Sequence, residues 1–172
     1  MGQGELRRAT EADLDQIMVI IQAAKQAIAR ADFNQWQDGY PMRTDMLADL
    51  TAGHLFVLTS ADQIMAVAAM IVGEEPNYQL IERGAWLHNG DYATIHRLAV
   101  ASAFHGQHVG EQLLTHMITW LRQTKPGLSI RVDTHADNVA MQTILTRCGF
   151  IACGTIYVDG NAPRRAYEHW LS

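Results

Sequence analysis

The sequence predicts an α/β or α+β fold in which helices flank a mixed β-sheet. Apolar residues recur at helical spacing in two long segments, residues 14–28 and 109–121, and short β-rich runs surround these segments. The expected elements follow the order β-α-α-β-β-β-α-β-α-β-β along the chain. This order is typical of a layered sandwich with a mixed sheet.

Length and composition are those of one globular domain, and we expect that domain to span residues 1–172. The chain has 48% hydrophobic and 18% charged residues and a formal net charge of −5. An acidic protein is not expected to bind nucleic acid, which requires a positive surface. No signal peptide, no membrane-spanning stretch and no metal-binding cysteine spacing is present, so we expect a cytoplasmic protein that does not bind membranes.

The first part of the chain is expected to hold one strand and two helices. The strand is expected at residues 5–10. A helix follows to about residue 30, because Thr10 suits an N-cap and carboxylates suit the first turn. A polar, aromatic connector over residues 32–42 then leads to a second helix at residues 44–51.

The middle of the chain is expected to be mostly β-structure. Two β-rich runs, residues 54–59 and 63–72, have the spacing of a hairpin. Residues 74–91 are polar and rich in turn formers, and they predict no regular element. A further strand is expected at residues 94–100, followed by a loop that contains glycine. The remaining elements are expected at residues 109–121 (helix), 128–134 (strand), 138–148 (helix), 150–158 (strand) and 165–170 (strand).

Residues 95–114 carry the first indication of chemistry. A strand runs into a loop with Gly106 and Gly110, and an amphipathic helix begins directly afterwards. The first amides of such a helix lack partners and the helix dipole adds positive charge, so this turn suits a phosphate. A plain strand–helix turn is an equally good interpretation. The Rossmann and P-loop patterns are absent, which disfavours dinucleotide and nucleoside triphosphate sites.

A second indication lies in residues 138–150. Asn138 follows a strand and begins a helix, and the helix ends at Gly149-Phe150. As N-cap and C-cap, Asn138 and Gly149 have a sufficient structural explanation.

Taken together, the two segments resemble the GNAT superfamily of acetyl-CoA-dependent N-acetyltransferases. The family's pyrophosphate loop, [RQ]-x-x-G-x-[GA], aligns with HGQHVG at residues 105–110. Its second motif, N-x-x-A-x-x-[LF]-Y-x-[KR]-x-G-F, aligns with residues 138–150. The strand 97–100 resembles the family's fourth strand, and the order of elements matches from about Glu5 to Trp170. Gln35-Trp36 with Tyr40-Pro41 resembles a QW…YP group of bacterial members.

The resemblance implies transfer of an acetyl group from acetyl-CoA to a primary amine of an acceptor that the sequence does not identify. It implies no metal, and it makes homodimerisation an expectation because relatives commonly form dimers. The residues implied in binding acetyl-CoA are Leu98, Ala99, Val100, His105, Gly106, Gln107, His108, Val109, Gly110, Glu111, Asn138 and Arg147.

The resemblance also implies catalytic roles. The backbone N–H of Val100 would donate to the oxygen that becomes negative during attack. His96 is the first candidate for the general base, because it has the strand parity of Val100 and a suitable ordinary pKa; a packed strand histidine is the alternative. Glu82 and Asp133 are weaker candidates for the base.

Three positions depart from the family's pattern. His105 stands where Arg or Gln is usual, and His108 stands where glycine is usual, which requires histidine to accept the backbone angles of the loop. Leu145 replaces the tyrosine commonly proposed to protonate the leaving thiolate. Water or Tyr157 is expected to substitute for it. These departures favour the alternative function, a catalytically weak or inactive acyl-CoA-binding or sensor module.

Acceptor contacts are expected from Phe33, Trp36 and Tyr40 in the connector; a hydrophobic plug between helix and sheet is the alternative. Residues 1–100 carry 7 basic and 13 acidic residues, against 6 and 5 in residues 101–172, which favours a cationic acceptor. The carboxylates expected mainly on the solvated surface are Asp32, Asp38, Asp45 and Asp49. The histidines that would suggest a metal, at 105, 108, 116 and 135, match no HExxH pattern and fall on a loop, a helix and a later loop, so we expect no metal.

Overall fold

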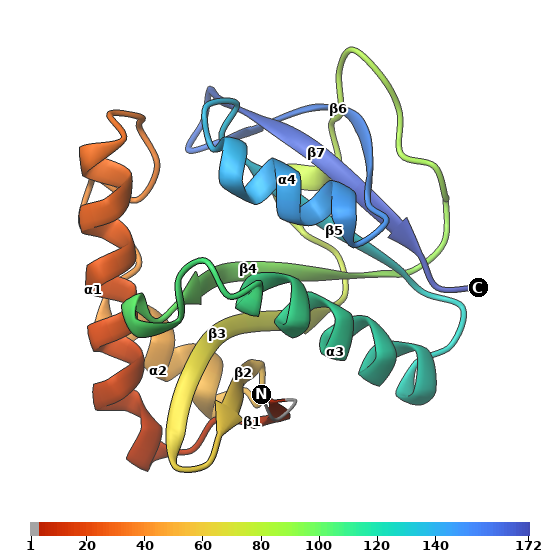
Figure 1. Cartoon of the computed structure of the whole chain (residues 1–172). Helices are drawn as coiled ribbons and strands as arrows, with labels where there is room; N and C mark the ends of the chain where they lie inside the picture. Colours follow the sequence, from red (N-terminus) through yellow and green to blue (C-terminus); the bar gives the residue numbers. More distant parts are fainter. Residues whose placement is uncertain (1–3) are drawn as a thin grey trace. The chain divides into compact units, whose positions relative to one another are not determined.

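A computed structural model describes residues 4–172 and contains the expected elements in the expected order (Figure 1). The strands are β1 (Glu5–Arg8), β2 (Leu55–Ser60), β3 (Gln63–Val72), β4 (Tyr92–Val100), β5 (Ser129–Thr134), β6 (Ile151–Val158) and β7 (Ala162–Trp170). The α-helices are α1 (Leu14–Arg30), α2 (Arg43–Thr51), α3 (Val109–Thr124) and α4 (Val139–Arg147). Short 3₁₀ turns occur at η1 (Glu11–Asp13), η2 (Pro76–Tyr78) and η3 (Ser102–Phe104).

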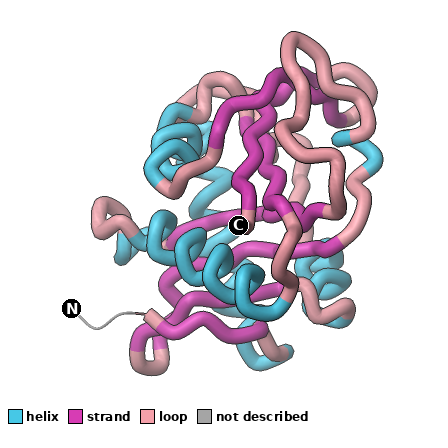
Figure 2. The backbone as a smooth tube through the Cα atoms, turned by 90° about the vertical axis from the view of Figure 1, so that its right-hand side faces the viewer, coloured by secondary structure: helices cyan, strands magenta, loops and turns pink. Residues whose placement is uncertain are grey.

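The strands form a mixed sheet, as predicted (Figure 2). Their hydrogen-bonded order is β1-β2-β3-β4-β5-β7-β6. β4 and β5 run parallel, whereas the pairs β1–β2, β2–β3, β5–β7 and β6–β7 are antiparallel. The parallel pair requires a crossover, and α3 lies in the connection between its two strands.

The chain divides into two compact units, which are described separately. The first contains the described residues up to Met70 together with residues 96–116, and the second contains residues 71–95 and 117–172. The expectation of one domain over residues 1–172 stays a prediction.

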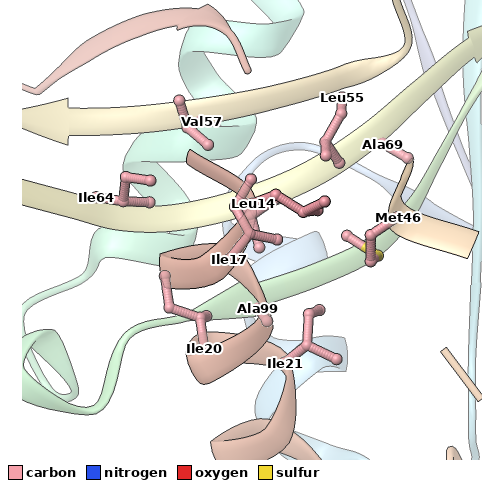
Figure 3. Packing of buried hydrophobic residues seen from close by; sticks show 11 residues of the cluster. Leu14, Ile17, Ile20, Ile21, Met46, Leu55, Val57, Ile64, Ala69 and Ala99 are labelled. Atoms are coloured by element: carbon pink, nitrogen blue, oxygen red, sulfur yellow. The ribbon is translucent and has the colours of Figure 1, made fainter. Parts of the chain in front are cut away.

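The core of the first unit lies between α1 and the strands, and Figure 3 shows its side chains. Leu14, Ile17 and Ile21 recur at helical spacing on α1 and point toward Val57 of β2 and Ala99 of β4. Ile17 and Ile21 are fully buried. The apolar stripe seen in the sequence is therefore the face of α1 that fills this core.

The start of α1 is fixed by a charged pair. Arg7 donates from both terminal nitrogens to the Asp13 carboxylate, at 2.7 and 2.9 Å, and the Thr10 amide donates to the same carboxylate at 2.7 Å. The hydrogen bond from Arg7 is the main reason that the pKa of Asp13 falls to about 2. Thr10 is the N-cap of this turn, as predicted.

The second unit has its own apolar cluster, in which Tyr78, Ile156 and Ala166 are buried. The segment after β3, for which the sequence predicts no element, contributes Tyr78 to this cluster. Glu82 forms an isolated antiparallel bridge with Thr155, with N–H···O distances of 2.9 and 2.8 Å. Part of this segment therefore pairs with β6 although its sequence is polar and turn-rich.

β7 begins at Ala162, three residues before the predicted start at Arg165. A proline at position 163 argues against a strand that is paired on both sides, because it has no N–H to donate. At this end β7 pairs only with β6, with Pro163 opposite Tyr157, and its pairing with β5 starts at Arg165. The missing N–H is therefore not needed there.

Within residues 4–172, no helix is both long enough and apolar enough to cross a membrane.

Candidate functional site

The end of β4 carries the first group of predicted site residues. Ala99 is buried, whereas Leu98 and Val100 are half-buried. Arg97 lies within the strand with a left-handed backbone, φ 57°. Alternation of side chains holds only along regular strand, so spacing alone does not place His96 on the face of Val100 across the left-handed Arg97. The role of His96 itself stays a prediction.

Arg97 is held by a side chain from α2 and another from the connector. Its guanidinium donates to the carboxylate of Asp49 and lies 5.2 Å from the centre of the Tyr40 ring. Burial opposes the charge on Arg97, but Tyr40 and Asp49 outweigh it and raise the pKa of Arg97. Burial raises the pKa of the Tyr40 phenol, and Arg97 opposes that change only in part. Both groups therefore keep their ordinary protonation states at neutral pH.

Asp49 corrects the expectation that the connector and α2 carboxylates lie mainly on the solvated surface. Its side chain is 9% exposed and is paired with Arg97, whose side chain is 16% exposed. The sequence contained one indication of this pair. Arg97 lies within the predicted strand TIHRLAV, next to the apolar residues 98–100, and a buried arginine requires an acidic partner.

The loop after β4 contains two residues with a left-handed backbone. His105 Nε2 lies 3.0 Å from the carbonyl oxygen of Val100 and, because that oxygen can only accept, Nε2 carries the proton. Gly106 and His108 are left-handed, with φ 76° and 58°. Histidine in that conformation costs about 1–2 kcal/mol, which explains why glycine suits this position in the motif. His108 adopts left-handed backbone angles despite this cost.

The first turn of α3 follows this loop directly. The helix begins at Val109, and the Gln112 N–H donates to the His108 oxygen at 3.0 Å. The amides of Val109 and Gly110 precede that bond and have no acceptor inside the helix. The loop thus fits a pyrophosphate: left-handed residues bring the backbone close, and the helix end offers N–H donors.

The second unit contains the predicted residues of the second motif. The Asn138 side chain caps α4 by accepting from the Met141 amide at 3.1 Å. Arg147 is exposed in the last turn, and Gly149 follows with φ 82°. Leu145, at the position of the family's tyrosine, is fully buried. The helix caps were predictable from sequence. Leu145 packs inside the core, so this position offers no proton donor.

Tyr157 on β6 lies beside a carboxylate. Its hydroxyl donates to Glu82 at 2.9 Å, and this hydrogen bond raises the pKa of the phenol. Asp133 is engaged differently, since it accepts from the buried hydroxyl of Tyr78 at 2.6 Å. The two weaker base candidates therefore differ in their partners: Glu82 accepts from the surface residue Tyr157, whereas Asp133 accepts from the buried Tyr78.

The connector aromatics have different surroundings. Trp36 is half-buried and packs against the α1 core, as the plug interpretation expects, with a left-handed backbone at φ 60°. Phe33 is half-buried, and Tyr40 lies over Arg97. The structure thus brings Tyr40 together with β4, which the sequence alone did not indicate.

For residues 4–172, no three His, Cys, Asp or Glu side chains are grouped so that they could hold a metal ion.

A family model described as the acetyltransferase (GNAT) family matches residues 21–150. A GNAT-family acetyltransferase from Streptococcus agalactiae 2603 is 35% identical to the chain, with a TM-score of 0.89 over 97% of this chain and 95% of that one. A GNAT-family acetyltransferase from Listeria monocytogenes 4b F2365 is 18% identical, with a TM-score of 0.74 over 97% and 94%, and supports the fold alone. Comparison with curated proteins gives no significant match.

Proposed function

Because the chain belongs to the GNAT family of acetyltransferases, we propose that it transfers an acetyl group from acetyl-CoA to a primary amine of a separate acceptor. The observation that carries the proposal is the loop of residues 105–110, whose left-handed Gly106 and His108 lead directly into the N-terminus of α3. Acetyl-CoA supplies the activated acetyl group as a thioester. The amine nitrogen bonds to the carbonyl carbon, the carbon–sulfur bond breaks, and the thiolate leaves while the nitrogen loses a proton.

The chain's own residues would bind and orient the cosubstrate. The amides of Val109, Gly110 and Glu111 would hold the pyrophosphate, with His105, Gln107 and His108 beside it. The backbone at Leu98, Ala99 and Val100 would hold the acyl arm, and the Val100 N–H would donate to the carbonyl oxygen as its negative charge develops. In the second unit, Asn138 and Arg147 stay candidates for further contacts.

His96 is the proposed general base, because an amine must lose a proton to attack. We expect His96→Ala to lower kcat/KM by roughly 10²–10⁴ and to remove the acidic limb of the pH–rate profile. His54→Ala, another half-buried histidine of the first unit, serves as the control and should keep both. An unchanged pH–rate profile in His96→Ala would remove His96 from this role and leave Glu82 to be tested.

Protonation of the leaving group is the second open proton transfer. Tyr157 is our candidate, because its phenol carries a proton at neutral pH; the hydrogen bond that it donates to Glu82 raises its pKa and makes it a weaker acid. A thiol has an ordinary pKa of about 8.5, so its thiolate also leaves without a strong acid. The buried Leu145 therefore lowers the expected rate but does not prevent the reaction.

The acceptor is proposed to be a cationic amine that contacts Phe33, Trp36 and Tyr40. The acidity of residues 1–100 supports a cationic acceptor, with 13 acidic against 7 basic residues. Asp49 is not available to the amine because its charge is paired with Arg97. A cytoplasmic location is supported by the free thiols of Cys148 and Cys153. Homodimerisation stays a prediction.

A panel of amines tests the proposal. The purified chain is mixed with acetyl-CoA and a polyamine, an amino acid, an aminoglycoside or a peptide with a free N-terminus, and released thiol is measured against an amine-free control. We expect turnover with a cationic amine and stabilisation by coenzyme A of about 2.7 kcal/mol at 100 times Kd. Preference for neutral or anionic amines would contradict the cationic acceptor.

The second candidate function is an acyl-CoA-binding or sensor module that does not turn over. It is favoured by the burial of Leu145 and by the left-handed His108. Binding of coenzyme A without thiol release for any amine would support the sensor. Absence of coenzyme A binding would contradict both functions.

A further inference from the structure

We propose that Arg97 is a positioning residue that couples the acceptor connector, residues 32–42, to the end of β4. The catalytic part of this inference rests on the proposed function, because that function assigns the connector to the acceptor and Leu98–Val100 to the acetyl thioester. The structural part stands on contacts within the first unit alone.

Three elements meet at the guanidinium of Arg97. Its own backbone belongs to β4, Asp49 from α2 pairs with its terminal nitrogen, and the Tyr40 ring from the connector lies 5.2 Å away. The side chains of Arg97 and Asp49 are largely buried, at 16% and 9% exposure. A buried pair with a planar guanidinium against a ring permits few alternative geometries, so it fixes the three elements with respect to one another.

The strain at Arg97 points to the same role. A left-handed non-glycine residue within a strand is unfavourable and persists only where its surroundings hold it. The Nε of Arg97 is also buried without a hydrogen bond within residues 4–172, a further cost that the site retains. The left-handed residue directly precedes Leu98, so the pair with Asp49 fixes the direction in which Leu98, Ala99 and Val100 continue.

The connector is anchored on its other side as well. Lys25 of α1 donates to the Gly39 carbonyl at 2.6 Å, Gln37 donates to the Lys25 carbonyl at 3.3 Å, and Trp36 packs against the α1 core. These contacts tie the connector to α1, and the contact of Tyr40 with Arg97 ties it to β4. Loss of Arg97 should therefore release the connector from β4 while leaving it attached to α1.

Hydrogen–deuterium exchange with peptide resolution tests the structural part. In Arg97→Met, we expect peptides covering residues 36–42 and 98–101 both to exchange about tenfold faster, the factor for one lost hydrogen bond to a charged group. Arg7→Met is the matched control, because it breaks the other part-buried arginine–aspartate pair of the first unit, with Asp13. It should accelerate neither peptide.

Kinetics test the catalytic part, with the acceptor of the amine panel that has the highest kcat/KM as the probe. In Arg97→Lys, which keeps the charge but loses the planar fork, we expect the acceptor KM to rise about tenfold. The Kd for coenzyme A, measured by calorimetry, should change less than the acceptor KM, because the loop of residues 105–110 proposed to hold the pyrophosphate is not altered. Tyr40→Leu should raise the acceptor KM in the same way while leaving the Arg97–Asp49 pair intact. If Arg97→Met does not fold, Tyr40→Leu replaces it in the exchange experiment.

The outcomes separate the two proposals. If the wild-type chain releases no thiol with any amine, the proposed function fails, and the exchange experiment alone still decides whether Arg97 couples the connector to β4. Exchange that rises in only one of the two segments would overturn the coupling. The coupling would also be overturned if Arg7→Met accelerated hydrogen exchange in both segments as much as Arg97→Met. An acceptor KM that is unchanged in both Arg97→Lys and Tyr40→Leu would overturn it as well.

Discussion

Glu168→Ala is expected to lower the free energy of unfolding by about 3–5 kcal/mol, because it leaves a buried arginine without its anion. Glu168 lies on β7 and is fully buried. Its carboxylate accepts from the Ser129 hydroxyl at 2.6 Å, from Arg131 Nε at 3.2 Å and from the Leu87 amide at 2.5 Å. Arg131, with 7% of its side chain exposed, keeps only neutral partners after the substitution.

Those neutral partners belong to β4 and to the segment that precedes it. Arg131 donates to the His88 carbonyl at 2.7 Å and lies 4.3 and 4.0 Å from the ring centres of Trp86 and Tyr92. The pair of Arg131 and Glu168 therefore attaches the polar segment before β4 to the strands of the second unit. Its loss should loosen that segment as well as lower overall stability.

Urea unfolding followed by circular dichroism measures the effect. Ser129→Ala is the matched control, because it removes one donor to the same carboxylate while keeping the ion pair, and it should cost about 1 kcal/mol. Glu168→Gln should lie between the two variants, since it keeps the shape and an acceptor oxygen but removes the charge. Equal stabilities of Glu168→Ala and Ser129→Ala would show that the ion pair is not needed.

Gly84→Ala is expected to cost about 3 kcal/mol, because a methyl group there collides with backbone. A Cβ at residue 84 would lie 1.8 Å from the carbonyl oxygen of Cys153, an atom that no side-chain rotation can move. Next to this contact, the Ala85 amide donates to the same oxygen at 3.0 Å. The substitution would therefore push the segment away from β6.

Gly90→Ala is the matched control, because nothing lies within 4 Å of its Cβ position and its φ is not left-handed. It should leave stability unchanged or raise it slightly through the unfolded chain. Thermal unfolding of the two variants measures the difference. Equal melting temperatures would show that the segment adapts without cost. The displaced segment carries Glu82, so Gly84→Ala should also disturb the hydrogen bond between Glu82 and Tyr157.

Local signals in the sequence determined the order of elements and the motifs. Thr10 and Asn138 mark helix starts, apolar spacing marks α1 and α3, and the turn with Gly106 marks the phosphate loop. Each signal works over a few neighbouring residues, because capping, helical spacing and turn conformation depend on adjacent backbone. These features were therefore predictable without knowledge of distant contacts.

Contacts between distant residues could not be predicted in this way. Arg97 and Asp49 lie 48 residues apart, and Arg131 and Glu168 lie 37 apart. A single sequence does not reveal which arginine pairs with which carboxylate, since several of each are present. The left-handed backbone of Arg97 was not predictable either, because its side chain is held by partners from other elements.

The sequence by itself determined the fold class, the order of elements, the loop at residues 105–110 and the caps of α4. Only the tertiary structure decided that Asp49 is buried beneath Arg97, that Leu145 is inside the core and that residues 82–85 pair with β6. The physical reason is the range of the interactions. Helices, turns and caps follow from neighbouring residues, whereas burial, ion pairing and close backbone contacts exist only once distant segments are packed together.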